Sequence, residues 1–416
     1  MLRKINKISR NNRSEIPNLK LISWIIFLFS ITIVLISFVS VIFPALILVS
    51  NTVIIPEIES ITPNPYEFGV WSAGLIISNV IIFGLTFLYL TNRLPITISN
   101  ALKRLFAFEI SKKIAIISIT ILLIIYITAS VSELSTEENF EDYKNVKNRV
   151  EGWSIDQAFG SFEPHVRYFL ISTSMTLFSN FKMIPFLTSI ALLITIYFIT
   201  KTIAQKRFAG IVSMVIVLQS NLFLTYDTTV AYTNFWILFY LLSLFFIYKF
   251  WPLSPVFYLF SISAKALTIA FLPMSIFFIL RSKISKKQKI LATGVTTAII
   301  IVGGIAIMGS DLSPTQETEE EFNEKEFWMG FTSFSYQLRF DGLVILFMIP
   351  LIVGLFLISK SGIRNAESVM VLIAGMLLIA PVLTGFTDQT NQPYRFVSLV
   401  VFFAMGVGVL LSKRQA

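Results

Sequence analysis

The sequence predicts an all-α membrane protein, a polytopic bundle of about twelve transmembrane helices. Of its 416 residues, 55% are hydrophobic and 14% are charged, and the mean hydropathy is +0.77. Soluble domains carry about 25% charged residues, so this composition excludes a soluble protein of this length. Apolar runs of about 20 residues, the length needed to cross a bilayer, recur from end to end. We therefore expect a single helical membrane domain.

The chain divides into three parts by its charge and apolar patterning. Residues 1–20 are basic and polar and are expected in the cytosol, and residues 21–112 are expected to form an accessory transmembrane hairpin. The first apolar run has the positive flank of a signal peptide but is far longer than a signal-peptide core, which favours a retained span. Residues 113–416 form the predicted core, with outer loops at 133–168 and 309–341.

The predicted spans alternate with basic and acidic turns. They are expected at Leu21–Leu48, Val70–Leu90, Ile114–Ala129, Ile184–Thr200, Gly210–Leu224, Phe235–Tyr248, Pro252–Leu280 as a helix pair, Ile290–Met308, Gly342–Ile358, Val369–Pro381 and Val397–Leu411. The pair is predicted because Lys265 and Pro273 interrupt a run that is too long for one span. The segment from His165 to Asn180 is predicted to be an amphipathic helix along the outer surface.

Charge is distributed very unequally between the two predicted sides of the membrane. With the N-terminus inside, the inner segments hold 24 of the 33 Lys and Arg residues and 3 of the 24 acids. Because cytoplasmic loops carry an excess of Lys and Arg, this bias predicts a multi-pass cell-membrane protein with both termini in the cytoplasm. It also explains the net charge of +9 without a nucleic-acid partner.

The residue types that are missing exclude several chemistries. The chain has no cysteine and one histidine, which removes disulfides, thiolate nucleophiles and thiolate or histidine-rich metal centres. No glycine-rich phosphate loop of an ATP-driven machine is present. No cofactor is predicted, and an acidic loop that attracts Mg²⁺ or Mn²⁺ is left open because no fixed ligand spacing appears.

Four short motifs carry chemistry-bearing residues and follow one another in a definite order. They are ENFEDYKNVKNRVEGW with Glu141, Asp142 and Tyr143; FEPHVRYFL with His165 and Arg167; SISAKALTIAFLP with Lys265; and QPYRF with Tyr394 and Arg395. In order and sidedness they resemble the GT-C superfamily of membrane glycosyltransferases, especially the relatives of the dolichyl-phosphate-mannose protein mannosyltransferases and bacterial lipid glycosyltransferases. The resemblance covers roughly Ile114 to Lys413.

This resemblance implies transfer of a sugar from a polyprenyl-phosphate carrier to a lipid, glycan or protein acceptor on the extracytoplasmic face. The sugar and the acceptor are not specified by the motifs. A carboxylate must accept the proton of the acceptor. Asp142 or Glu141 is the predicted base, with Glu133 and Glu138 as further candidates.

The lipid phosphate that leaves requires cations at membrane depth, and Arg167, Lys265 and Arg395 are the candidates for binding it. Lys265 is the most informative, because an ionisable side chain at the centre of a transmembrane helix costs about 3 kcal/mol, and more without a partner. His165 and Tyr143 complete the predicted substrate-binding set by their place in the motifs.

Each of these residues also has a plainer interpretation. Acids in an outer loop are usually solvated, Lys265 can reach the headgroups without a ligand, and arginines at span ends often anchor a helix at the interface. Two other classes of protein remain open: a polytopic transporter or lipid flippase, and a noncatalytic membrane scaffold. Transporters often contain internal repeats, and no convincing repeat relates the two halves of this chain.

Overall fold

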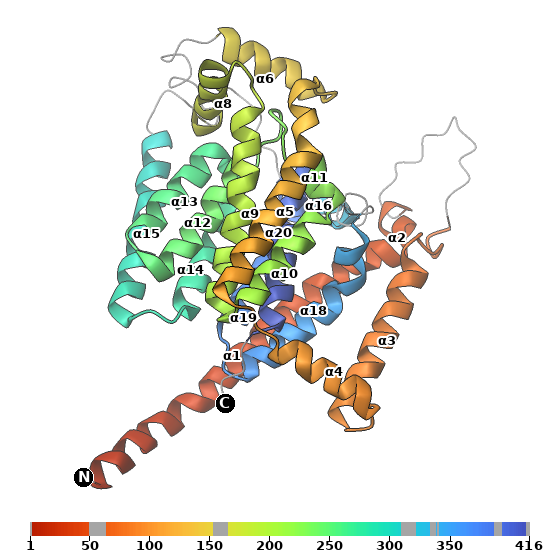
Figure 1. Ribbon diagram of the computed structural model, residues 1–416, viewed down its shortest axis with the longest axis vertical. Helices are drawn as coiled ribbons and strands as arrows, with labels where there is room; N and C mark the ends of the chain where they lie inside the picture. Colours follow the sequence, from red (N-terminus) through yellow and green to blue (C-terminus); the bar gives the residue numbers. More distant parts are fainter. Residues whose placement is uncertain are drawn as a thin grey trace.

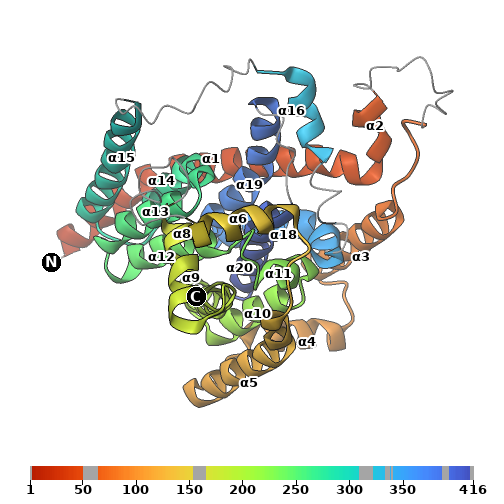
Figure 2. The same cartoon turned by 90° about the horizontal axis from the view of Figure 1, so that it is seen from above.

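The computed structural model describes residues 2–49, 64–152, 165–308, 322–332, 338, 341–386 and 393–412. These residues form helices and turns with no strand among them, which confirms the predicted all-α class (Figure 1). Figure 2 shows the same helices from above, grouped around α20.

Seven helices in the described residues are long and apolar enough to cross a membrane, so the chain is a membrane protein. The seven apolar segments are Leu21–Ile42 in α1 (Leu2–Ile42), Ser72–Tyr89 in α3 (Ser72–Leu90), Lys112–Ser135 in α5 (Lys112–Ser130) and η1 (Val131–Ser135), α9 (Met183–Ala204), α18 (Gly342–Lys360), α19 (Asn365–Phe386), and Pro393–Leu410 in η3 (Pro393–Phe396) and α20 (Val397–Leu410). The sequence predicted about twelve spans. Four of them correspond to helices that are shorter than expected, and the predicted span Ile290–Met308 corresponds to α15 (Lys286–Met308), which is not among the seven.

Four apolar stretches are helical but too short for the crossing criterion. They are α10 (Arg207–Leu218), α12 (Phe235–Lys249), α13 (Leu253–Ala264), and the pair η2 (Ala266–Phe271) and α14 (Leu272–Arg281). The predicted span from Gly210 to Leu224 is divided because Ser220 starts the separate helix α11 (Asn221–Tyr226), its side chain accepting the N–H of Phe223 at 3.0 Å. A side-chain cap of this kind ends one helix and begins another.

The remaining helices connect or flank these segments. They are α2 (Pro44–Val49), α4 (Ile96–Ala107), α6 (Glu141–Gly152), α8 (His165–Phe178), α15 (Lys286–Met308) and α16 (Glu324–Gly330). Helices α6 and α8 lie at one end of the bundle and α4 lies at the other (Figure 1).

Helix α20 forms the centre of the core, and α9, α10, α18 and α19 all pack against it. Small residues permit this close packing: a Cβ at Gly408 would lie 2.3 Å from Ser213 Oγ of α10 and 2.4 Å from Thr200 Cγ2 of α9. The Ser213 hydroxyl also donates to the Ala404 carbonyl of α20 at 2.8 Å. Small residues and interhelical hydroxyl bonds are the usual means of joining helices in membranes.

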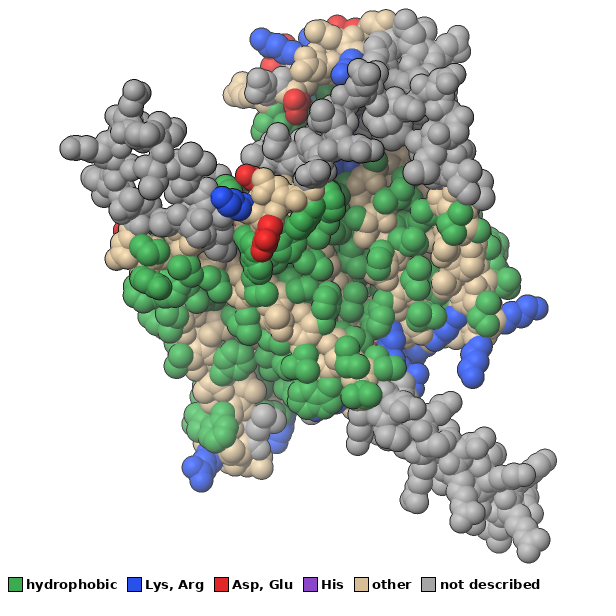
Figure 3. Space-filling view, turned by 180° about the vertical axis from the view of Figure 1, so that it is seen from behind, with side chains coloured by type: hydrophobic (Ala, Val, Ile, Leu, Met, Phe, Trp, Pro, Cys, Tyr) green, Lys and Arg blue, Asp and Glu red, His purple; other side chains and the backbone are tan. Residues whose placement is uncertain are grey.

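The two ends of the bundle differ in charge. A broad apolar belt covers the face drawn in Figure 3; the charged side chains seen below the belt are Lys and Arg, whereas acids are seen above it together with further Lys and Arg. A buried ion pair at the basic end joins Arg281 of α14 to Glu367 of α19, and Ser23 of α1 donates to the same carboxylate. The ends defined by this polarity are called here the acidic end, with α6 and α8, and the basic end, with α4.

Candidate functional site

A turn between α11 and α12 organises the acidic end. Its residues are Asp227 to Asn234, and none of them was predicted as a site residue from the sequence. Asp227 is 1% exposed, and its carboxylate accepts from Ser130 Oγ of α5 at 2.8 Å while its carbonyl accepts from Ser189 Oγ of α9 at 2.6 Å. Burial raises the pKa of Asp227 to about 6. The start of the turn is therefore fixed to two membrane helices.

Acids of the loop after α5 bind this turn at successive points. Glu133 accepts from Thr228 Oγ1 at 2.9 Å, and the Glu138 carboxylate accepts the N–H groups of Val230 and Ala231 at 2.6 and 3.2 Å. Burial raises the pKa of Glu138, and the two N–H groups oppose that shift. Glu133 thus binds a side chain of the turn and Glu138 binds its backbone, and both acids are partly buried.

Arg167 of α8 binds the carbonyl groups of the two residues whose N–H groups bind Glu138. Its guanidinium donates to the carbonyls of Val230, at 3.2 Å, and Ala231. Its Nε atom is buried and has no hydrogen-bond partner among the described residues. Arg167 thus fixes the turn with one part of its side chain and keeps another donor available.

Asp142 is the third loop acid that contacts the turn, and it differs from the other two because its side chain is exposed. The Tyr232 hydroxyl donates to Asp142 Oδ2 at 2.8 Å. The Tyr232 ring stacks on Tyr394 with centroids 4.3 Å apart and an interplanar angle of 12°. This contact orients the Asp142 carboxylate without burying it.

Lys265 lies where α13 ends, as the sequence predicted. Its backbone is extended, with φ −160° and ψ 114°, which separates α13 from η2. Its Nζ atom lies 3.8 Å from the ring centroid of Tyr394 and 5.7 Å from that of Trp236. Aromatic faces attract a cation, so these rings hold the ammonium group. Burial lowers the pKa of Lys265 well below its usual value, and the positive charges of Arg395 and Arg167 lower it further.

These groups line one cavity of about 510 Å³ at the acidic end. Four basic residues contribute to its wall, together with four aromatic rings and a single carboxylate among the described lining residues. The basic residues are Arg149, Arg167, Lys265 and Arg395; the rings are Tyr168, Tyr232, Trp236 and Tyr394; and the carboxylate is Asp142. The cavity is therefore cationic, with one acid at its edge.

Of the predicted site residues, the structure brings together Asp142, Arg167, Lys265 and Arg395. Tyr143 follows Asp142 on α6 but does not line the cavity. Glu141 and His165 are the first residues of α6 and α8, and their side chains lie outside the described part of the structure.

Sequence reasoning missed Arg149, Tyr232 and Trp236. Arg149 donates to the Tyr168 hydroxyl at 3.4 Å and shares a face of α6 with Asp142, seven residues earlier. A spacing of i, i+3, i+4 and i+7 from Asp142 identifies that face in the sequence. Tyr232 and Trp236 had no such signal, because only the tertiary packing places them beside Lys265.

Within the described residues no group of three or more His, Asp or Glu side chains could hold a metal ion. The acidic segment ETEEEFNEKEFW of the second outer loop begins in residues that the structure does not describe.

Comparison of this chain with protein families, with curated proteins and with solved structures gives no match.

Proposed function

We propose that this protein is a membrane glycosyltransferase of the GT-C type, which moves a sugar from a polyprenyl-phosphate carrier to a lipid, glycan or protein acceptor. The observation that carries the proposal is the convergence of Asp142 with Arg167, Lys265 and Arg395 on one cavity. These residues come from α6, α8, the junction after α13 and η3, so their meeting is a property of the fold. A volume of about 510 Å³ lies in the range of small-ligand sites.

In the proposed reaction, the acceptor hydroxyl attacks the anomeric carbon of the sugar. The bond from that carbon to the phosphate oxygen breaks, and the polyprenyl phosphate leaves with the bonding electrons. Asp142 accepts the acceptor proton, in an orientation fixed by Tyr232. Glu141 is the alternative base. No metal step is included in this proposal.

The negative charge on the departing phosphate is stabilised in the proposal by Lys265, Arg395 and the free Nε of Arg167. Preorganised cations in a site with little water stabilise developing charge much more strongly than they would in solution. The buried Nε atoms of Arg167 and Arg395 both lack partners among the described residues, so each can donate to a phosphate oxygen.

The carrier chain needs an apolar surface next to the cavity. Helix α8, which carries Arg167 and Tyr168, turns Phe169, Leu177 and Phe178 away from the protein, with 61%, 68% and 43% of their surfaces exposed. We assign the polyprenyl chain to this side of α8, where it would remain in contact with the bilayer.

The function is tested by reconstituting the full-length protein in proteoliposomes with short-chain polyprenyl-phosphate sugars of different sugar identity. We expect release of polyprenyl phosphate from at least one donor, measured by chromatography. Movement of a fluorescent donor across the bilayer with no bond cleavage would instead identify a flippase. Neither cleavage nor movement for any donor would remove both assignments.

We also propose that the basic end faces the cytoplasm, with both termini inside, because the segments assigned to the inside hold 24 of the 33 Lys and Arg residues and 3 of the 24 acids. The absence of cysteine makes single-cysteine labelling unambiguous. A membrane-impermeant maleimide should label Lys144→Cys on α6 in intact cells, whereas Lys287→Cys at the start of α15 should react only after permeabilisation. Both lysines are exposed. The reverse labelling pattern would place the candidate site in the cytoplasm and contradict the proposal.

A further inference from the structure

A second and larger cavity lies at the basic end, separate from the site already described. Its volume is about 1770 Å³, and residues of α3, α4, α9, α10, α12, α18 and α20 line it. No residue lines both cavities.

The walls of this cavity are amphipathic. Its apolar side includes membrane-facing side chains that are exposed by 36% to 45%, namely Leu85, Phe198, Leu343, Phe347 and Leu357. Its polar side carries five basic residues and one carboxylate, namely Lys103, Lys201, Lys206, Arg207, Lys249 and Glu109. Positive charge is therefore in excess beside an apolar groove.

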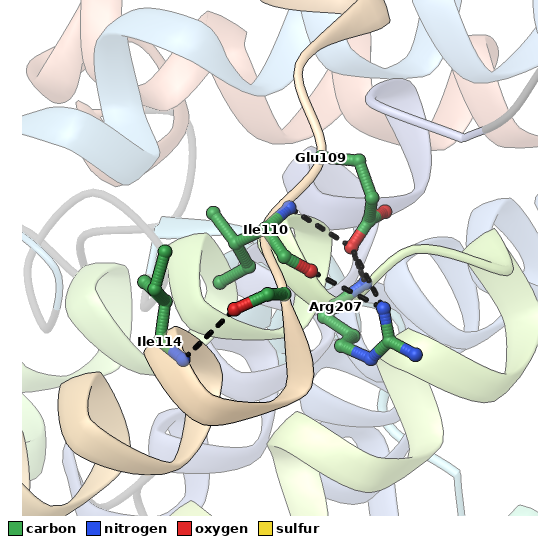
Figure 4. A network of polar contacts seen from close by, with 5 residues as sticks. Glu109, Ile110, Ile114 and Arg207 are labelled. Carbon is green, nitrogen blue, oxygen red and sulfur yellow. Dashed lines mark hydrogen bonds and ion pairs between the residues drawn. The ribbon is translucent and has the colours of Figure 1, made fainter.

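Two of these basic residues, Lys206 and Arg207, bind other groups of the protein; the contacts of Arg207 are drawn in Figure 4. Arg207 donates to the Ile110 carbonyl at 3.2 Å and lies 3.8 Å from Glu109, whose carboxylate also accepts the N–H groups of Ile110 and Arg207. The buried Lys206 donates to the Phe106 carbonyl at 2.6 Å. These bonds fix α4 and the start of α5 to α10.

Lys201 and Lys249, in contrast to Lys206 and Arg207, have no such polar partner in the part of the chain that the structure describes. Among the described residues neither forms an ion pair, and the Lys201 ammonium lies 5.6 Å from the ring centroids of Tyr197 and Phe198. Lys201 is in the last turn of α9, and Lys249 is in the last turn of α12. Two helices thus end with an unpaired ammonium group on one cavity.

We propose that this cavity binds an anionic phospholipid of the surrounding bilayer. Its phosphate lies between Lys201 and Lys249, and its acyl chains follow the groove between α3 and α18. A basic pocket between transmembrane helices is the type of site that binds anionic lipid headgroups. The side chains that face the groove at α3 and α18 supply the apolar contact that a free anion would not need. This inference is independent of the proposed glycosyl transfer.

The test measures phospholipid retained by the full-length protein after detergent exchange, using native mass spectrometry. The protein is first incubated with phosphatidylglycerol or with phosphatidylcholine that has the same acyl chains. We expect selective retention of phosphatidylglycerol, and at least a fivefold loss of that retention in the Lys201→Gln, Lys249→Gln double variant. The matched control is Lys286→Gln, Lys287→Gln, which removes the same charge from exposed residues of α15 at the same end and should behave as wild type.

A second variant tests the acyl-chain groove. Leu85→Trp places a bulky side chain in the cavity and should lower phosphatidylglycerol retention, whereas Phe87→Trp, at a position that does not line the cavity, should leave it unchanged. Equal retention by wild type and the double lysine variant would overturn the proposal. Displacement of the lipid by an equal concentration of glycerol 3-phosphate would also overturn it, because the site would then bind a free phosphate without the chains. Gel-filtration profiles establish that each variant is folded.

Discussion

Asp142→Asn is expected to lower glycosyl transfer from a polyprenyl-phosphate sugar by a factor of about 10² to 10⁴, the usual contribution of a general base. Asparagine has nearly the same shape and can still accept the hydrogen bond from Tyr232, which is 2.8 Å long in the native protein. The variant therefore removes proton acceptance while retaining the local contact. Initial rates with saturating donor in proteoliposomes measure the effect.

Two further variants separate the base from its neighbours. Glu141→Gln tests the alternative base directly, and transfer should collapse in one of the two variants if a carboxylate of this pair is the base. Glu137→Gln removes an exposed acid of the same loop that does not line the cavity, so its rate should be unchanged. Full activity of both Asp142→Asn and Glu141→Gln would remove the assigned base.

Lys265→Met should reduce kcat/KM for the donor by a factor of about 10² to 10³, comparable to the loss of one donor from a preorganised anion site. Methionine retains the apolar volume between Trp236 and Tyr394 but carries no charge. Because the phosphate carries more charge on departure than in the donor, much of the loss should appear in kcat. Steady-state kinetics with varied donor concentration give both constants.

The control for this variant is Lys325→Met, at an exposed position on α16 that is also part of the acidic end and does not line the cavity. It should match wild type. A Lys265→Met protein with unchanged kcat/KM and normal gel-filtration behaviour would show that the ammonium only reaches the membrane surface. Arg395→Gln then tests whether a second cation of the cavity behaves in the same way.

The sequence was most informative where a single chain segment determines the outcome. Apolar runs located the helices, and Lys265 located the break after α13, because an ionisable side chain within an apolar run disfavours a continuous span. The number of helices that cross the membrane was harder to predict from the sequence. The cap formed by Ser220 divides one predicted span, and hydropathy does not register a hydroxyl that accepts a backbone N–H.

The candidate site was predictable in part. Charged residues at span ends are visible in the sequence, which is why Arg167 and Arg395 could be named, whereas Asp142 was named from its place in the motif ENFEDYKNVKNRVEGW. Glu133 and Glu138 looked equivalent to Asp142 as loop acids, yet their contacts with Thr228, Val230 and Ala231 involve a turn about 95 residues away. Sequence periodicity cannot distinguish the exposed acid from the two that bind the turn, because tertiary packing decides which acid remains exposed.

The Lys265 ammonium lies against Tyr394, and the Tyr394 ring lies against Tyr232. The cation and the aromatic face therefore satisfy one another. A bare phosphate that draws the ammonium away leaves the ring uncovered, and a neutral saccharide that stacks on the ring leaves the ammonium unpaired. A conjugate that offers an anion and a ring surface together replaces both halves of the contact, so under the proposed function we expect the intact donor to bind more tightly than either of its two fragments.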